Sequence, residues 1–332
     1  MVDWMSYTTV FRAYSPVAPL FVPIGIVLYM YPLPSHGGYV LLCGGSVSAD
    51  LGLCNPMAST CRLLPAAAVD MSTARAAAGP SYVLVTRHDV SGGNDSSVVC
   101  IHAVNHAENV GGSDGMDYQI FSSMSGKWGL PKARGGWRRP GTASAYRFGW
   151  HKDAAVCCGG TVYWLATSYL GVGLAYCAFA FAINVRTERT WTIELQEKYA
   201  ELEIDRNNRR YFHCSPSPAT SSDGRLSLVM SLRSRQIEVW VLVGDDRWTL
   251  QRRIDMPELL PDHCRRARPP DWLRTYCDSS GYMFVHVDAR DLVIAIDDDD
   301  SPCPMQQIVR SRVSCCLYEM DFSTYISKMK YF

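Results

Sequence analysis

The stretch FAFAINVRTERTW, residues 179–191, decides which fold class the sequence predicts. It consists of a run of aromatic and small apolar residues, a polar break that begins at Asn184, and a tryptophan, Trp191, that opens a second run. Aromatic and β-branched residues favour strands, and a polar break between two such runs is typical of a hairpin. We therefore expect two antiparallel strands here, joined by a turn.

The same unit recurs along the chain. Its other copies, each given as a run with its closing residue, are Leu51–Cys54 with Cys61, Tyr118–Phe121 with Trp128, Ile237–Val241 with Trp248, and Cys316–Met320 with Tyr325. The five closing positions are 67, 63, 57 and 77 residues apart, which is longer than the roughly 40–50 residues of compact propeller repeats. We therefore expect insertions in the loops.

A second recurring element is a glycine followed at once by an apolar strand. It occurs at Gly38, Gly160, Gly224 and Gly281. Each glycine fits a turn that needs a positive φ. A strand, then a hairpin, then a recurrence is what radially arranged antiparallel sheets require. The sequence thus predicts an all-β fold, a β-propeller-like array of antiparallel strands with irregular loops.

Two further predictions about local structure follow from the same pattern. Trp128, Trp191 and Trp248 are expected to pack between neighbouring sheets, because tryptophan buries a large apolar area. Helix signals are sparse, and only Ile193–Glu203 and Arg265–Tyr276 are candidates for short helices.

Composition excludes some function classes. The chain has 332 residues, 48% of them hydrophobic, and its 32 Lys and Arg balance its 32 Asp and Glu. A nucleic-acid-binding surface needs an excess of basic residues, so no nucleic-acid partner is expected. The 13 cysteines are odd in number and form no C-x-x-C pattern, so we expect reduced core residues in a protein of the cytoplasm or nucleus.

The first 36 residues differ from the rest. No residue from Ala13 to Ala49 carries a formal charge, but frequent prolines break the apolar run, so no membrane span is expected. Asp3 and Arg12 cancel, which argues against a signal peptide. We expect residues 1–36 to be a docking strand or the remnant of a truncated domain, and residues 37–327 to be the propeller.

Four stretches carry a resemblance to a known family. They are LCNPMASTCRLLP (residues 53–65), YQIFSSMSGKWGLP (118–131), CCGGTVYWLA (157–166) and FAINVRTERTWTIEL (181–195). Together they resemble the carboxy-terminal F-box-associated domain of plant F-box proteins, in particular of a large grass group. The resemblance implies a kelch-like propeller that recognises a protein partner. In that family an amino-terminal F-box binds a Skp-type adaptor of a ubiquitin ligase, and residues 1–36 do not show the F-box pattern.

The residues themselves carry no catalytic signature. His102 and His106 lie in a predicted strand without an accompanying H-E-x-x-H pattern, and the acidic run at residues 297–300 reads as a solvated loop. We therefore expect no metal, no cofactor and no catalytic residue. The candidate partner contacts are arginines with a neighbouring tryptophan or in clusters, a composition favoured at protein interfaces: Trp137, Arg138, Arg139, Arg265 and Arg266.

The sequence thus predicts a protein-interaction module that is not an enzyme and binds an unidentified protein. Solvated loops remain the simpler interpretation of the arginine clusters. The alternative function is a propeller-fold enzyme, a hydrolase or an oxidase, with its site in the central channel. That alternative requires polar side chains from separate strands to converge on the channel.

Overall fold

The computed structural model of the chain describes residues 10–13, 20–23, 30–36, 38–44, 51–55, 60–65, 67, 81–86, 98–106, 115–135, 146–170, 175–195, 202–204, 210–212, 214–221, 223–232, 236–244, 247–255, 273–277, 282–287, 290–295 and 306–308. Within these residues every regular element is a strand. The described part of the chain contains no helix long and apolar enough to span a membrane.

The strands form five antiparallel sheets. The first contains β3 (Met30–His36), β4 (Tyr39–Gly44), β5 (Leu51–Asn55) and β6 (Thr60–Leu64). The second contains β7 (Ser81–Thr86), β8 (Val98–His106) and β9 (Gly115–Ser122), and its fourth strand is split into β10 (Lys127–Trp128) and β11 (Lys132–Gly135). The third contains β12 (Tyr146–Cys158), β13 (Thr161–Leu170), β14 (Ala175–Asn184) and β15 (Thr190–Glu194).

The remaining strands repeat this plan. The fourth sheet contains β18 (Cys214–Thr220), β19 (Leu226–Leu232), β20 (Gln236–Val243) and β21 (Arg247–Asp255). The fifth contains β22 (Leu273–Cys277), β23 (Tyr282–Val287), β24 (Arg290–Ala295) and β25 (Gln306–Ile308). Two separate hairpins are β1 (Val10–Ala13) with β2 (Leu20–Pro23), and β16 (Leu202–Ile204) with β17 (Arg210–Phe212).

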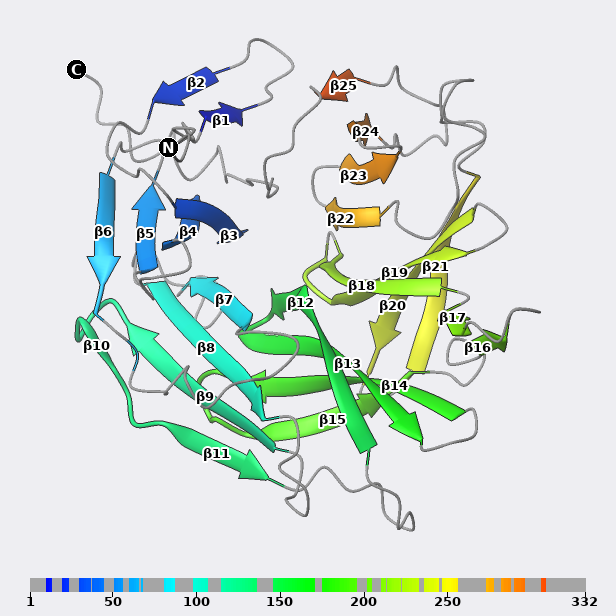
Figure 1. Cartoon of the computed structure of the whole chain (residues 1–332), viewed down its shortest axis with the longest axis horizontal. Helices are drawn as coiled ribbons and strands as arrows, with labels where there is room; N and C mark the ends of the chain where they lie inside the picture. Colours follow the sequence, from blue (N-terminus) through cyan, green and yellow to red (C-terminus); the bar gives the residue numbers. More distant parts are fainter. Residues whose placement is uncertain are drawn as a thin grey trace, which may run out of the picture.

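The sheets are arranged in a ring around a central axis (Figure 1). In each sheet the strands lie side by side in chain order, and the first strands of successive sheets contact one another: β3 with β7, β7 with β12, β12 with β18, and β18 with β22. The first strands are therefore the inner strands. This arrangement confirms the predicted all-β propeller. The β1–β2 hairpin occupies the sector between the fifth and first sheets in Figure 1.

The inner strands give the ring two distinct faces. Thr220, at the end of β18, donates a hydrogen bond from Oγ1 to the carbonyl of Cys157, near the end of β12, over 3.3 Å. Neighbouring inner strands thus run in the same direction. We call the face at which the inner strands begin the start face, and the face at which they end the end face.

Connections on the two faces differ in length. On the end face, Gly38, Gly160 and Gly224 have φ of 82°, 73° and 80°, which confirms the predicted positive-φ turns. Gly281 lies outside the described residues. On the start face, each sheet is joined to the next by a long segment, namely 65–80, 136–145, 195–213 and 256–272. Two connections depart from this pattern, because residues 87–97 join β7 to β8 and residues 296–305 join β24 to β25 on the end face.

Apolar side chains fill the spaces between sheets. Along β7, Tyr82 and Leu84 belong to a buried cluster shared with the first sheet, whereas Val83 and Val85 belong to one shared with the third. Successive strand residues point to opposite faces. Because both faces of the sheet are covered, the four central residues of the strand, at positions 82–85, are all buried hydrophobic residues rather than alternating with polar ones. A third cluster joins the third and fourth sheets.

The three closing tryptophans pack between sheets, as predicted. Trp128 of the second sheet donates from Nε1 to the carbonyl of Pro65, which follows the first sheet, over 2.6 Å. Trp191 and Trp248 both pack into the cluster between the third and fourth sheets. Their hairpins, and the one closed by Cys61, are confirmed. The fifth copy, from Cys316 onward, lies outside the described residues.

Two expectations about local structure need correction. Ile193 and Glu194 are strand residues of β15, and residues 273–276 lie in β22, so the helix predictions are wrong there because sheet pairing overrides local propensity. Cys54 and Cys61 form a disulfide, so not all cysteines are reduced. Cys157 and Cys158 are buried and form no disulfide, as predicted. The predicted domain boundary at residue 36 falls between β3 and β4, which pair with each other.

Candidate functional site

The inner strands line the axis, so a channel site must come from them. Three inner strands have described side chains in the segments from the level of the bulge to the end face, and apart from the phenol of Tyr82 these side chains are small or apolar: Ser81–Thr86, Ala155–Cys158 and Ser217–Thr220. The Sγ atom of Cys158 lies 3.3 Å from Oγ1 of Thr220, which ties two inner strands together. These three segments carry neither a carboxylate nor an imidazole, and we interpret them as a packed seam between neighbouring inner strands.

The inner strand β12 is interrupted by a large bulge. Trp150 pairs with Ala166 of β13, and the next pair is Ala155 with Trp164. Four residues of β12, at positions 151–154, therefore lie opposite a single residue of β13. Bulges of this kind redirect side chains and occur frequently next to functional sites. The bulged residues are His151, Lys152, Asp153 and Ala154.

The height of this bulge along the axis can be fixed by one contact. Trp164 pairs with Ala155, the residue directly after the bulge, and donates from Nε1 to Oγ of Ser81 over 3.1 Å. Ser81 is the first residue of β7. The bulge therefore lies level with the beginning of the neighbouring inner strand, at the start-face mouth of the channel.

Two other inner strands are irregular as well. The register of β3 shifts between Pro32 and Ser35, and that of β22 shifts between Leu273 and Thr275. The second shift leaves Arg274 outside the ladder. The inner strands thus place a histidine, a lysine, a carboxylic acid and an arginine at bulged positions around one axis.

Sequence reasoning missed this site. No sequence motif marks His151, and Arg274 falls inside the predicted helix Arg265–Tyr276. A signal was present, because residues 146–158, YRFGWHKDAAVCC, place charged residues between two stretches of strand-forming residues. What the sequence lacked was the pairing with β13, which turns this interruption into a bulge on an inner strand.

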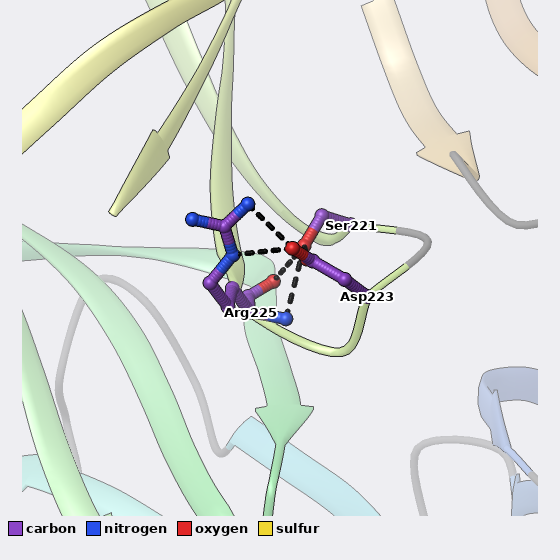
Figure 2. A network of polar contacts seen from close by, with 3 residues as sticks. All are labelled: Ser221, Asp223 and Arg225. Carbon is purple, nitrogen blue, oxygen red and sulfur yellow. Dashed lines mark hydrogen bonds and ion pairs between the residues drawn. The ribbon is translucent and has the colours of Figure 1, made fainter. Parts of the chain in front are cut away.

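A polar cluster on the end face has a different character (Figure 2). In the turn after β18, Arg225 donates from Nε to Oδ2 of Asp223 over 2.6 Å, and Ser221 Oγ accepts from the backbone N–H of Arg225 over 2.9 Å. Hydrogen bonds from Arg225 and Ser221 lower the pKa of Asp223 to about 2. This carboxylate therefore stays ionised and serves the turn rather than proton transfer.

Glu238 is a second engaged carboxylate. Its side chain is 4% exposed and accepts from Nη2 and Nε of Arg253 over 2.7 and 3.1 Å. Trp240 donates from Nε1 to the other oxygen over 3.0 Å. A buried carboxylate needs such partners, because an unpaired charge is costly to bury. Since its oxygens are occupied and shielded from solvent, Glu238 is interpreted as part of the packing.

The predicted partner contacts Trp137, Arg138, Arg139, Arg265 and Arg266 lie outside the described residues. Their positions in the chain fall within 136–145 and 256–272, two segments whose flanking strands end and begin at the start face. The acidic run at 297–300 also lies outside. His102 and His106 are in β8, a strand as predicted, and the described residues contain no group of three potential metal ligands.

Comparison with known proteins finds similarity in structure only. No family matches the sequence, and no curated protein matches it. An α-L-arabinanase from Penicillium chrysogenum, complexed with arabinobiose, is 10% identical, with a TM-score of 0.44 over 87% of this chain and 82% of that chain. An α-L-arabinofuranosidase from Fusarium graminearum, bound to an iminosugar inhibitor, is 8% identical, with a TM-score of 0.45 over 95% and 88%. A chain of a mitotic checkpoint complex is 11% identical, with a TM-score of 0.32 over 93% of this chain and 83% of that chain.

These likenesses concern the fold alone, so no substrate is transferred from the two glycosidases to this chain. They nevertheless overturn one prediction. The protein was expected not to be an enzyme, yet two of the solved structures that resemble it are enzymes. The prediction was wrong because it relied on the lack of a local motif, whereas catalytic groups can come from distant positions in a sequence.

Proposed function

We propose that the protein is a propeller-fold hydrolase whose site lies at the start-face mouth of the central channel. The observation that carries this proposal is the bulge of β12, which takes residues 151–154 out of the ladder on an inner strand. A regular strand at this place would use its backbone groups in pairing with β13. A four-residue bulge is the kind of irregularity found where a fold directs side chains to a functional site.

The residue types in the bulge suit hydrolysis. Histidine is the side chain that most often acts as a general base near neutral pH, and a nearby carboxylate orients and stabilises it. In the proposed reaction His151 takes a proton from water, the hydroxyl attacks the ester carbonyl or phosphorus, and the proton passes to the leaving oxygen. Lys152 and Arg274 supply positive charge for an anionic ester.

A glycosidase mechanism is less compatible with these strands. Most glycoside hydrolases use two carboxyl groups on either side of the scissile bond. Among the residues of the five inner strands, Asp153 is the one carboxylic acid. The proposal therefore specifies anionic esters as the substrate class and does not extend to arabinan.

The test is a hydrolysis assay on the purified full chain. The panel contains p-nitrophenyl acetate, p-nitrophenyl phosphate, bis-p-nitrophenyl phosphate and p-nitrophenyl α-L-arabinofuranoside. We expect hydrolysis of at least one of the two phosphate esters, with the neutral acetate as the comparison, and a loss of kcat/KM of about 100-fold in His151→Ala and in Asp153→Asn.

The matched control is Asp223→Asn, which alters a carboxylate on the opposite face of the ring. It is expected to leave kcat/KM unchanged. No hydrolysis of either phosphate ester, or equal losses in the three variants, would contradict the proposal. Selective hydrolysis of the arabinofuranoside would replace it with a glycosidase function.

A second candidate function is protein recognition on the start face. It is favoured by the long segments that join successive sheets on the start face, because binding residues are commonly carried on loops held by a rigid scaffold. In this proposal Trp137, Arg138, Arg139, Arg265 and Arg266 contact a protein in the cytoplasm or nucleus, as the resemblance to F-box-associated domains implies.

The discriminating experiment is a quantitative pull-down in which Arg138 and Arg139 are both changed to Glu. Loss of a specific protein that the wild-type chain retains would support recognition. The control is Arg186→Glu, since Arg186 is exposed in the β14–β15 turn on the end face. Equal retention by both variants would argue against the start face, and retention of a Skp-type adaptor would support the ligase role.

A further inference from the structure

The first sheet closes its outer hairpin differently from the next three. In those sheets the closing tryptophan lies opposite an apolar residue of the preceding strand: Trp128 opposite Phe121, Trp191 opposite Ala182, and Trp248 opposite Leu242. In the first sheet the corresponding pair is Cys61 of β6 opposite Cys54 of β5, and the two are joined by a disulfide. A covalent bond thus replaces a tryptophan contact.

The disulfide fixes β6, a strand that makes few packing contacts of its own. β6 is the outermost strand of its sheet, and four of its five residues are exposed. Its one buried side chain is Leu64, which packs into the cluster between the first and second sheets. Pro65, just beyond β6, accepts the hydrogen bond of Trp128. The position of β6 therefore bears directly on the junction between two sheets.

Cys54 and Cys61 differ in their exposure to solvent. Cys54 is 0% exposed, whereas Cys61 is exposed. Thiol–disulfide exchange requires a thiolate to reach one sulfur of the bond. Only the Cys61 side of this disulfide is open to such an attack, which fixes which sulfur is attacked and which one leaves.

We propose that the Cys54–Cys61 disulfide is a redox modification site that acts as a reversible clamp on β6. Its reaction partner is a dithiol reductant. One thiolate of the reductant attacks Sγ of Cys61, the bond between the two sulfurs breaks, and Cys54 leaves as the thiolate and takes up a proton. The second thiol of the reductant then resolves the mixed disulfide, so that the reductant is oxidised and Cys54 and Cys61 become free thiols.

The consequence of reduction is local loosening of β6. Without the covalent bond, Leu64 and the ladder to β5 are the contacts that hold the strand to its sheet. Arg62 lies within β6 and is exposed, so the bond between Arg62 and Leu63 is expected to become a cleavage site for trypsin when β6 detaches. Proteases cut segments that open locally, and edge elements with few buried contacts open first.

The experiment is limited trypsin digestion of the full chain with and without dithiothreitol, followed by mass spectrometry of the fragments. Cleavage after Arg62 is expected to be at least tenfold faster in the reduced protein. Cleavage after Arg186 and Arg189, both exposed in the β14–β15 turn, is expected to be unaffected and serves as the internal control.

A double variant, Cys54→Ser with Cys61→Ser, separates this disulfide from the other cysteines. It is expected to be cut after Arg62 at the fast rate whether or not dithiothreitol is present. The proposal is overturned if the wild-type rate after Arg62 does not respond to dithiothreitol. It is also overturned if alkylation of protein purified without reductant finds Cys54 and Cys61 as free thiols. Both readouts use the wild-type chain, so they hold even if the double variant fails to fold.

Discussion

Two turns of the ring follow the same backbone path with different residues. In the β9–β10 turn the N–H of Gly126 donates to the carbonyl of Ser122 over 2.9 Å, and in the β14–β15 turn the N–H of Glu188 donates to the carbonyl of Asn184 over 2.7 Å. Gly126 has a φ of 66° and Glu188 a φ of 55°. The left-handed conformation is therefore imposed by the hairpin, even where the residue has a side chain.

The difference between the turns lies in what stabilises that conformation. Asn184 Oδ1 accepts hydrogen bonds from the N–H of Thr187 over 2.9 Å, from the N–H of Arg186 over 3.2 Å, and from Oγ1 of Thr187 over 2.9 Å. Glu188 in turn forms an ion pair with Lys132 of the second sheet. The β9–β10 turn thus has glycine at the left-handed position and is unstrained there. The β14–β15 turn has Glu188 at that position, and the contacts of Asn184 and Glu188 offset the backbone strain.

The largest expected effect comes from removing the capping side chain of the strained turn. Asn184→Ala eliminates the three hydrogen bonds that Oδ1 accepts and the one that Nδ2 donates to Oγ1 of Thr161, and is expected to lower the free energy of unfolding by about 2 kcal/mol. Ser122→Ala, at the corresponding position of the other turn, should change it by less than about 0.5 kcal/mol. Urea unfolding of both variants measures the difference. Equal losses would show that the two turns depend equally on their side chains.

An intermediate effect is expected from giving the glycine turn a side chain. A Cβ at Gly126 would meet no atom within 4 Å, so Gly126→Ala tests backbone conformation without a steric clash. The left-handed region is unfavourable for alanine, and we expect a loss of about 1 kcal/mol in thermal or urea unfolding. Met124→Ala in the same turn, where Met124 is 73% exposed, is the control and should have almost no effect. A neutral Gly126→Ala would contradict the role assigned to positive φ.

The smallest effect concerns the ion pair between sheets. In Glu188→Gly, relief of backbone strain and loss of the pair with Lys132 are expected to cancel. When Lys132→Met has already removed the pair, the same substitution should raise the free energy of unfolding by about 0.5 kcal/mol. A double-mutant cycle in low salt measures this coupling. An identical effect of Glu188→Gly in both backgrounds would mean that the exposed pair contributes nothing.

Features that depend on local sequence could be predicted, and those that depend on pairing could not. The hairpins closed by Trp128, Trp191 and Trp248, and the positive φ of Gly38, follow from short patterns of residue type. The disulfide between Cys54 and Cys61 depends on the register of β5 and β6, which places the two residues opposite each other. Spacing along the sequence does not reveal that register.

The candidate site was hidden for the same reason. Residues 151–154 become a bulge because Trp150 and Ala155 pair with residues of β13 only two positions apart. In the sequence alone, charged residues within a strand are equally compatible with a solvent-exposed strand face and with a bulge at a functional site. Long-range pairing, rather than composition, separates these interpretations. The predicted helix over Ile193–Glu203 failed in the same way, since Ile193 pairs with Ala180 of β14.

The split fourth strand of the second sheet has a consequence for solubility. Between β10 and β11, Gly129 donates to the carbonyl of Ile120 over 2.8 Å and accepts from Nε2 of Gln119 over 2.7 Å. Pro131, which has no N–H to offer, follows Leu130, which is 83% exposed. An unbroken outer strand would present a continuous template for a strand from another molecule. Because the outer edge is interrupted beside Leu130, the most exposed large apolar residue of the described part of the chain, it offers no continuous row of free backbone groups there, which disfavours edge-to-edge pairing with a second copy.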